Sequence, residues 1–216
     1  NPLMKVFNNA ATGLLNTFMS GFNADNVQRG RSILKDKVGK SIVSENLSIY
    51  DDGTIDAGLS SCKFDGEGTP SQKTELVKDG VLKGFIYDIY TANKANIKST
   101  GNGFRGSYSS TPGVSSSNII LDFNKMTKID EIDNGIIATD LLGAHTANPI
   151  SGDFSVEVNN GFLIENGEIT KPIKKAMISG NVFETFKNCE AIDSQIKQYG
   201  SFILPKILLH NLRVIG

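Results

Sequence analysis

The rest of the chain is organised around one stretch, Leu142-Gly143-Ala144-His145-Thr146-Ala147-Asn148-Pro149-Ile150-Ser151-Gly152-Asp153-Phe154-Ser155. Two glycines, a proline and an Asn-Pro step interrupt any helix or strand there, so the backbone must turn repeatedly. A turning backbone cannot satisfy its own N–H and C=O groups, and we expect side chains of the loop to take those bonds, namely Thr146, Asn148, Ser151 and Asp153. Two interpretations stay open: a self-bonded connection between strands, or a loop presented at a cleft with His145, one of only two histidines in the chain.

Strand patterns lie on both sides of this stretch. Residues 136–142 are apolar enough for a strand or a helix, and the glycine ahead of them favours the strand. Phe154–Ile164 alternates, and Glu165-Asn166-Gly167-Glu168 predicts a hairpin into Ile169–Ile173. Pro172 indicates that this second strand lies at a sheet edge, because proline cannot donate to a neighbouring strand.

A second hairpin is predicted nearer the start of the chain. Lys73–Val77 and Val81–Tyr87 flank Asp79-Gly80, a dipeptide typical of a tight hairpin turn. Further strands are expected at four apolar stretches, namely Leu47–Tyr50, Asn118–Phe123, Ile203–Leu204 and Ile207–Ile215. The sequence Asp51-Asp52-Gly53 is interpreted as the turn that ends the first of these strands.

Helical periodicity is confined to a few segments. Asn1-Pro2 is typical of a helix start, and apolar residues then recur every three or four positions, namely Met4, Phe7, Ala11, Leu14, Phe18 and Phe22. This predicts an amphipathic helix to about residue 20, ended by Gly21. Shorter helical segments are expected at Asp25–Arg29, Lys128–Asn134 and residues 181–191, the last capped by Ser179-Gly180-Asn181. Tyr87–Asn96 fits a continuation of the hairpin or a short helix, and we favour a helix from Tyr90. The predicted fold class is α+β: a mostly antiparallel β-sheet with an N-terminal amphipathic helix and a few further helices.

Composition and charge argue against several classes of partner. The 216 residues carry a formal net charge of −1, which gives no electrostatic case for binding nucleic acid or an anionic membrane. The sequence contains neither an apolar run that could span a bilayer nor a signal-peptide pattern, so we expect a cytoplasmic protein. Cys62 and Cys189 form no CxxC pair and are expected to be reduced and buried. The chain begins with Asn1 rather than methionine, which suggests a fragment.

Patterns of catalytic residues are sparse. The sequence has no HExxH or CxxC, and no Gly-x-Ser-x-Gly surrounds a serine that could form a triad with His145 and Asp153. His210 lies in an apolar run, where a structural role is expected. The Gly- and Ser-rich segment 99–118 lacks the Lys-Ser/Thr of a phosphate-binding loop. Large side chains in this segment favour an ordered surface loop over a flexible linker, namely Phe104, Arg105 and Tyr108.

Three motifs together resemble the TldD/PmbA family, once labelled modulators of DNA gyrase. They are Thr100-Gly101-Asn102-Gly103-x-Arg105, His145-Thr146-x-Asn148-Pro149-x-Ser151-Gly152-Asp153-Phe154-Ser155 and Gly161-Phe162-x-Ile164-Glu165-Asn166-Gly167. The second and third motifs are specific, whereas the first alone is weak. The resemblance runs from the first helix to the end of the chain in the family's order. It implies that residues 1–216 are the family's C-terminal domain and that the N-terminal domain of the family is absent.

The resemblance also implies two kinds of subunit. The TldD kind is a zinc metallopeptidase with Leu-Leu-His-Glu-Ala-Val-Gly-His on its helix and a later Met-Cys-Gly-Lys; the PmbA or TldE kind lacks both and pairs with the first. This chain has Asn16 and Gly21 where the histidine ligands would be and Thr17 where the glutamate would be, and Cys189 lies in a different context. Glycine cannot bind zinc, asparagine is a poor ligand, and threonine cannot deprotonate a zinc-bound water. We therefore expect neither catalytic nor metal-binding residues on this chain, no cofactor of its own, and zinc on a partner subunit.

By this resemblance the chain is expected to be a non-catalytic PmbA/TldE-like subunit of a cytoplasmic metallopeptidase complex that processes unfolded peptides, and to line its substrate channel. The partner would be a TldD-type catalytic subunit or a second copy of this chain; neither nucleic acid nor membrane is expected as a ligand. Two alternatives stay open: a stand-alone peptide- or protein-binding module, and a hydrolase with a site at the His145 loop. The residues expected to bind substrate come from two loops, namely Gly101, Asn102, Gly103, Arg105, His145, Thr146, Asn148 and Asp153.

Overall fold

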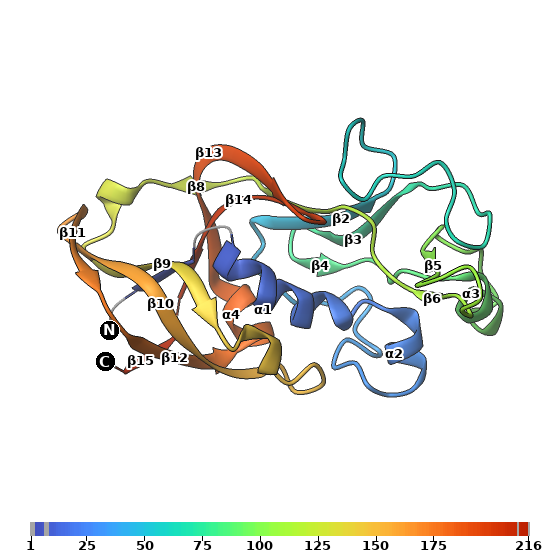
Figure 1. The fold of residues 1–216 in the computed structure, drawn as a ribbon, viewed down its shortest axis with the longest axis horizontal. Helices are drawn as coiled ribbons and strands as arrows, with labels where there is room; N and C mark the ends of the chain where they lie inside the picture. Colours follow the sequence, from blue (N-terminus) through green and yellow to red (C-terminus); the bar gives the residue numbers. More distant parts are fainter. Residues whose placement is uncertain (1–2, 7–8, 211, 216) are drawn as a thin grey trace.

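A long β-sheet runs through the computed structural model, which describes residues 3–6, 9–210 and 212–215 and the side chains from residue 12 onward within them (Figure 1). Its strands are ordered β15 (Arg213–Ile215), β12 (Ala176–Asn181), β10 (Asp153–Glu165), β9 (Asn134–Leu142), β1 (Leu3–Val6), β14 (Phe202–Leu209), β7 (Ile119–Phe123), β2 (Leu47–Asp52), β3 (Lys73–Lys78) and β4 (Val81–Leu82). Three further strands join it: β11 (Glu168–Ile173) beside β10, β13 (Cys189–Tyr199) beside β14, and β8 (Met126–Thr127) beside β13.

Most neighbouring strands in the sheet are antiparallel. Among the described strands, the parallel pairs are β1–β9, β14–β7 and β13–β8. A separate two-stranded sheet pairs β5 (Gly103–Phe104) with β6 (Gly113–Val114). The predicted α+β class with a mostly antiparallel sheet is confirmed.

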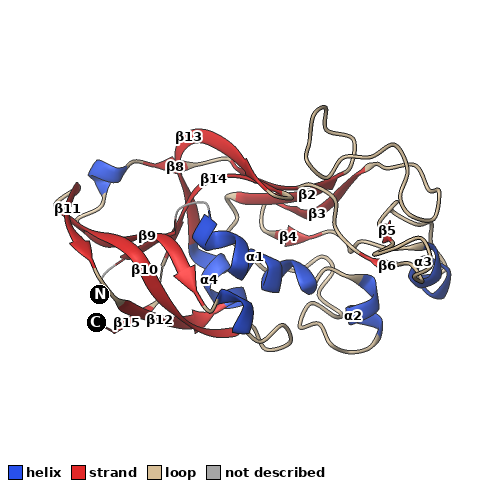
Figure 2. Ribbon diagram, viewed as in Figure 1, coloured by secondary structure: helices blue, strands red, loops and turns tan. Residues whose placement is uncertain are grey.

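The helices are short (Figure 2). Helix α1 (Asn9–Ser20) crosses the middle of the molecule, where it contacts β9 and α4 (Val182–Thr185). Helices α2 (Ala24–Gln28) and α3 (Ile89–Ala95) contact each other. The described residues also form three single turns of 3₁₀-helix, namely η1 (Ile129–Glu131), η2 (Ala144–Thr146) and η3 (Phe186–Asn188). Among the described residues, no helix combines the length and the apolar character that crossing a membrane would need.

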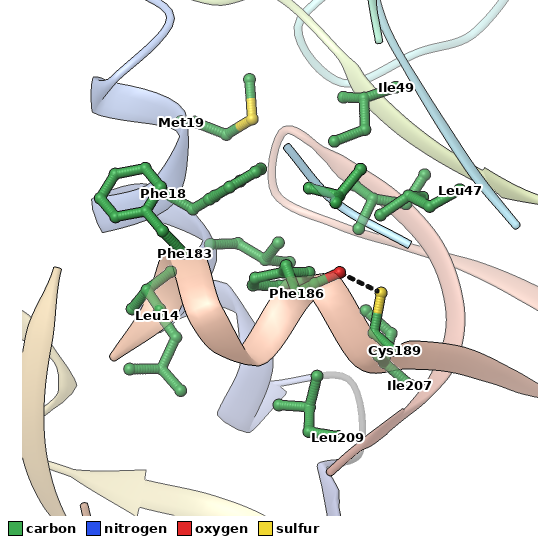
Figure 3. Close-up of a cluster of buried hydrophobic side chains, with 14 of the residues drawn as sticks. Leu14, Phe18, Met19, Leu47, Ile49, Phe183, Phe186, Cys189, Ile207 and Leu209 are labelled. Atoms are coloured by element: carbon green, nitrogen blue, oxygen red, sulfur yellow. Dashed lines mark hydrogen bonds between the residues drawn. The ribbon is translucent and has the colours of Figure 1, made fainter. Parts of the chain in front are cut away.

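Aromatic packing fixes α1 in the core. The fully buried ring of Phe18 stacks on Phe186, with centroids 4.8 Å apart, and lies 5.3 Å from Phe22 and 5.5 Å from Phe183. Figure 3 shows Phe18, Phe183 and Phe186 together with apolar side chains of the sheet, namely Leu47, Ile49, Ile207 and Leu209. Asn16 lies on the same helix but is exposed. The sheet therefore holds α1 by its apolar face and leaves the Asn16 side open.

Both predicted hairpin turns are confirmed. Asp79 and Gly80 have φ angles of 45° and 79°, and Asn166 and Gly167 have φ angles of 52° and 80°. Such turns need two successive residues with positive φ, which Asn-Gly and Asp-Gly adopt at little cost. Strand β11 pairs only with β10 among the described strands, so the predicted edge position of Pro172 is also confirmed.

The start of the chain corrects the predicted helix. Leu3–Val6 is strand β1, inserted between β9 and β14, and helix α1 begins only at Asn9. As a strand, these four residues pair with a neighbour on each side. This pairing stabilises them more than a helix would, so it overrides the helical pattern of apolar residues. The predicted cap Asn1-Pro2 and Phe7 lie outside the described residues. The predicted end of the helix is confirmed, since α1 stops at Ser20, directly before Gly21.

Two other strands are longer or shorter than predicted. Asp51 and Asp52 were expected to form a turn but belong to β2, where Asp51 pairs with β3 and β7. In contrast, only Val81–Leu82 of the predicted strand Val81–Tyr87 pairs with β3. The helix predicted from Tyr90 is confirmed as α3, which Asp88 caps by accepting the Thr91 N–H at 2.7 Å.

The C-terminal part contains strands that the sequence patterns did not predict. The helix expected over residues 181–191 is only α4 followed by η3, and Ala191 lies in β13. Asn181 is nevertheless the N-cap of this helix, as predicted, and it also ends the unpredicted strand β12. Of the two cysteines, Cys189 is buried as expected, whereas Cys62 is exposed, which corrects the prediction.

Candidate functional site

The loop 143–153 is held in shape by its own polar groups. The Asn148 side-chain oxygen accepts the backbone N–H groups two and three residues further on, at 2.9 and 3.1 Å. The Thr146 hydroxyl donates to the Gly143 carbonyl at 2.7 Å. The backbone N–H of Asn148 donates to the Asp153 carbonyl at 2.9 Å, which closes the loop at its base. The prediction that side chains of this loop satisfy a turning backbone is confirmed for Thr146, Asn148 and Ser151, whereas the Asp153 carboxylate binds other side chains.

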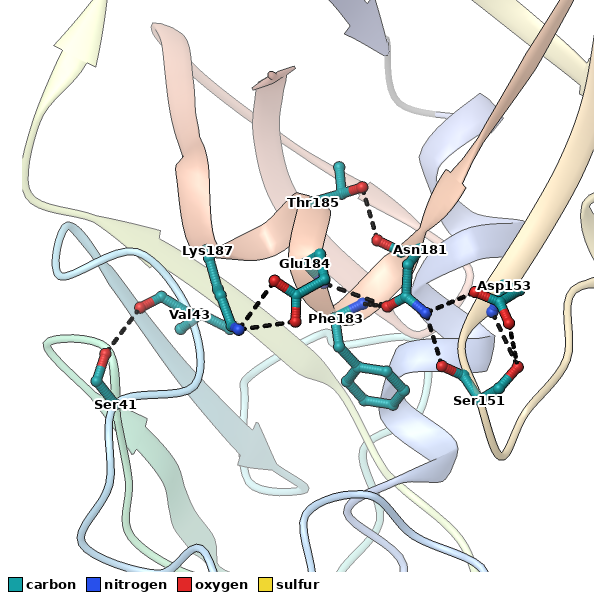
Figure 4. A network of polar contacts seen from close by, with 9 residues as sticks. All are labelled: Ser41, Val43, Ser151, Asp153, Asn181, Phe183, Glu184, Thr185 and Lys187. Carbon is teal, nitrogen blue, oxygen red and sulfur yellow. Dashed lines mark hydrogen bonds and ion pairs between the residues drawn. The ribbon is translucent and has the colours of Figure 1, made fainter. Parts of the chain in front are cut away.

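Asn181 ties the same loop to helix α4 (Figure 4). Its amide Nδ2 donates to the Ser151 carbonyl at 2.7 Å and to the Asp153 carboxylate at 2.8 Å. Its Oδ1 accepts the N–H groups of Phe183 and Glu184 in α4, at 3.1 and 3.3 Å. The hydrogen bonds from Asn181 and from the Ser151 hydroxyl lower the pKa of Asp153 below its ordinary value. Asp153 therefore has a structural task in this loop.

Gly152 sets the packing of the loop against α4. It has a φ of 83°, and a Cβ added there would lie 2.5 Å from Cδ2 of Phe183. We expect Gly152→Ala to lower the free energy of unfolding by about 2 kcal/mol. Gly30 is a matched control, because it has a φ of 69° but nothing within 4 Å of an added Cβ. Gly30→Ala should cost about 1 kcal/mol from backbone strain alone. Equal losses in urea denaturation would contradict a packing role for Gly152.

His145 itself lies in η2 at the exposed surface of this loop. The neighbouring Ala144 packs on α1 so closely that a Cβ on Gly13 would collide with it. Within the described residues, His145 makes no hydrogen bond and no ion pair, and it does not line the two hollows described below. The loop is ordered as expected, and its place at a cleft stays a prediction.

A buried carboxylate fastens the other candidate loop to the sheet. Asp51, which is 1% exposed, accepts the Asn102 amide at 2.7 Å and both the N–H and the hydroxyl of Ser117 at 2.6 and 2.9 Å. Asn102 also donates to the Ser115 carbonyl and accepts the Thr100 hydroxyl. Burial raises the pKa of Asp51, and the bonds from Asn102 and Ser117 oppose that rise. The segment 99–118 is thus an ordered surface loop, as predicted.

The outer part of this loop is fixed by a second carboxylate and an arginine. Asp65 accepts the N–H groups of Glu67, Thr69 and Gly103 at 2.9, 2.9 and 2.8 Å. Arg105 donates from Nε to the Gly66 carbonyl and from Nη1 to a second carbonyl in its own loop, both at 2.7 Å. Arg105 therefore positions the loop, and only its remaining N–H groups could reach a ligand.

Two hollows meet at the exposed side of α1. One, of about 580 Å³, is lined by Asn16, by Gly101–Phe104 and by serines of the facing loops. The other, of about 500 Å³, lies between Thr12 and Asn16 on the helix and Gln198–Phe202 at the turn between β13 and β14. Asn16 lines both hollows. The structure thus brings Gly101, Asn102 and Gly103 beside Asn16 and leaves His145, Thr146, Asn148 and Asp153 on a separate loop.

The residues at this helix do not fit a zinc ion. Asn16 is exposed but is a neutral amide, and Thr17 is 8% exposed and carries no base. A side chain at Gly21 would enter the core, because an added Cβ would lie 3.4 Å from Leu34 and 3.5 Å from Phe183. Burial raises the pKa of Cys189 to about 12, and its Sγ donates to the Phe186 carbonyl at 3.2 Å. Among the described residues, no group of three or more His, Cys, Asp and Glu side chains could hold a metal ion.

Restoring the zinc motif on the helix is expected to fail. The triple variant Asn16→His, Thr17→Glu, Gly21→His should bind no stoichiometric zinc and show no peptidase activity, because the histidine at position 21 would face the core and a third ligand is missing. It should also melt earlier than Asn16→His alone, which changes an exposed residue. Elemental analysis that finds one tightly bound zinc per chain in the triple variant would refute this.

The structure also places at the hollow two residues that sequence reasoning missed. Leu59 and Phe64 line its rim together with Phe104. The sequence did hold a signal: large apolar side chains inside a segment rich in Gly, Ser and Asp are costly in a mobile linker. The same signal predicts that the 99–118 segment is an ordered loop.

Residues 5–216 match the family model described as the PmbA/TldA metallopeptidase C-terminal domain. An uncharacterized protein of Methanocaldococcus jannaschii is 48% identical over 193 residues, which cover 89% of this chain and 45% of that protein. Metalloprotease PmbA of Escherichia coli O157:H7 is 30% identical over 212 residues, which cover 97% of this chain and 44% of that protein.

A solved structure agrees with these matches. The crystal structure of TldE from Thermococcus kodakarensis superposes with a TM-score of 0.89 at 31% identity, and the match covers 100% of this chain and 51% of that one. The chain therefore spans about half the length of the relatives it matches.

Proposed function

Because this chain belongs to the PmbA/TldD family of metallopeptidases, we propose that it serves as a non-catalytic, TldE-like subunit of a cytoplasmic peptidase complex. The partner subunit supplies the zinc site, and this chain supplies one wall of the channel that leads unfolded peptides to it. The observation that carries the proposal concerns helix α1 and the Gly21 that follows it. Asn16, Thr17 and Gly21 occupy the positions of the zinc motif, yet two hollows still meet at Asn16.

A wall without catalytic residues can still contribute to peptidase activity by holding the substrate. Unfolded peptides differ in their side chains, so a channel that accepts many of them must bind mainly their backbone or features they share. The hollow at Asn16 is framed by ordered loops rather than by mobile ones, since Asp51 and Asp65 fix the 99–118 segment. Such a preorganised surface binds a flexible peptide with less loss of its own entropy.

The His145 loop is proposed to form another part of the channel when the partner is bound. His145 is exposed and has no partner among the described residues, whereas two N–H groups of Arg105 are engaged by carbonyls. We expect His145→Ala to raise KM for a long unfolded substrate severalfold in the assembled complex, and Arg105→Ala to act mainly by loosening its loop. If both variants assemble and leave KM unchanged, the two loops are structural only.

Assembly is the direct test of the subunit role. The protein is co-expressed with a TldD-type subunit that carries the His-Glu motif, and the complex is isolated by affinity and size-exclusion chromatography. A stable complex with both subunits supports the proposal. A homodimer without affinity for that subunit, or a monomer that binds peptides by itself, would instead favour a stand-alone binding module.

A further inference from the structure

The hollow beside Asn16 has an apolar rim around a polar floor. Leu59, Phe64 and Phe104 all line it, yet these side chains are 71%, 57% and 61% exposed. Exposed apolar residues scattered singly need no explanation, but three that frame one hollow of about 580 Å³ form a surface of the kind that binds ligands.

The polar side chains on the floor of the hollow are mostly uncharged. Hydroxyl and amide groups make up most of it, namely those of Asn16, Ser60, Ser61, Asn102, Ser115, Ser116, Ser117 and Ser201. The only carboxylate among the lining residues belongs to Asp65, which already accepts three backbone N–H groups. No Lys, Arg or His is among them. An anionic segment would therefore lose hydration there without meeting a counter-charge.

The backbone that carries the rim residues is held in place before any ligand binds. Phe104 lies in β5, which pairs with β6, and Phe64 forms a β-bridge with Pro70. On the Leu59 side, the neighbouring Ser60 N–H donates to the Asn118 side chain at 2.9 Å. A backbone fixed in this way lowers the ordering cost of binding.

We propose that this hollow binds an extended segment of unfolded polypeptide that carries a large, uncharged apolar side chain, which packs among Leu59, Phe64 and Phe104. The inference rests on the proposed function and adds a preference to it. Large apolar side chains are buried in folded proteins and become accessible when a chain unfolds. By binding such side chains, the rim would let the subunit select unfolded chains without recognising a particular sequence.

Peptide binding tests this inference. Three fluorescein-labelled peptides, identical except for a central Phe, Ser or Glu, are titrated with the purified protein, and binding is followed by fluorescence anisotropy. The Phe peptide should bind about tenfold more tightly than the other two. Phe64→Ser and Phe104→Ser should reduce this preference to about twofold or less. Tyr108→Ser is the matched control, because Tyr108 is 98% exposed and does not line the hollow, and it should bind as the wild type does.

The outcomes separate this inference from the proposed function. Equal affinity for the three peptides, or a preference that both Phe variants retain while their melting temperatures are unchanged, overturns the apolar site. Stimulation of a TldD-type partner by those same variants at wild-type level would then leave the subunit role intact. A clear preference for the Phe peptide without any stimulation of the partner supports the site and contradicts the subunit role.

Discussion

Phe18→Ala is expected to lower the free energy of unfolding by about 4 kcal/mol, the largest single loss we predict for this chain. The Phe18 ring is fully buried and contacts the rings of Phe22, Phe183 and Phe186. Truncation leaves a cavity at the junction of α1, α4 and the sheet, where the backbone of three elements would have to move to fill it. Urea denaturation followed by circular dichroism measures the loss.

The control for Phe18→Ala is an aromatic residue outside the core. Tyr108 is 98% exposed, so Tyr108→Ala should change the free energy of unfolding by less than about 0.5 kcal/mol. A loss of about 1 kcal/mol or less in Phe18→Ala would mean that α1 is not held by this cluster. The position of Asn16 at the hollows would then lack the support that the proposed channel wall needs.

Asp51→Ala is expected to cost about 3 kcal/mol and to open the hollow beside Asn16. Removing the carboxylate strands three donors, the amide of the buried Asn102 and the N–H and hydroxyl of the half-buried Ser117. The loop that carries Gly101–Phe104 would then lose its link to the sheet. Asp122, on the neighbouring strand, is exposed and serves as the control, with a change below about 0.5 kcal/mol for Asp122→Ala. Similar losses in the two variants would contradict the anchoring role of Asp51.

The titration of Asp51 gives a second, independent readout. Its pKa in the folded state is raised above the ordinary 3.8, chiefly because burial disfavours the charged form. A raised acid pKa means that the contribution of Asp51 to stability is largest below the unfolded value and declines as pH rises through the folded value. The stability of the wild type relative to Asp51→Asn, which cannot titrate, should therefore increase as pH is lowered from 7 toward 4. A difference independent of pH would contradict the raised pKa.

Features encoded by a few adjacent residues could be predicted from the sequence. The hairpin turns at Asp79-Gly80 and Asn166-Gly167 and the cap at Asn181 each depend on local backbone preferences, and the structure confirms them. Strand β1 could not be predicted, because its partners β9 and β14 lie far away in the sequence. The same reason applies to β12 and β13, whose residues carry weak local patterns and gain their order from the strands beside them.

The candidate site shows the same division. The turn residues of the 143–153 loop predict its self-bonded form. The turn predicted at Asp51-Asp52 is wrong, because Asp51 binds the distant Asn102 and Ser117. That Asn16 lies beside Gly101–Gly103 depends on the tertiary fold, and no spacing in the sequence encodes it. The family resemblance indicates both candidate loops, and only the structure shows that they lie apart.

Peptidase activity on an unfolded polypeptide tests the central claim most directly. Three samples are compared under identical conditions: this protein alone, a TldD-type subunit alone, and the two mixed. The proposed division of labour predicts no activity from this protein alone, little from the catalytic subunit alone, and strong activity from the mixture that a zinc chelator abolishes. Zinc-dependent activity from this protein alone, or a mixture no more active than the catalytic subunit, would contradict it.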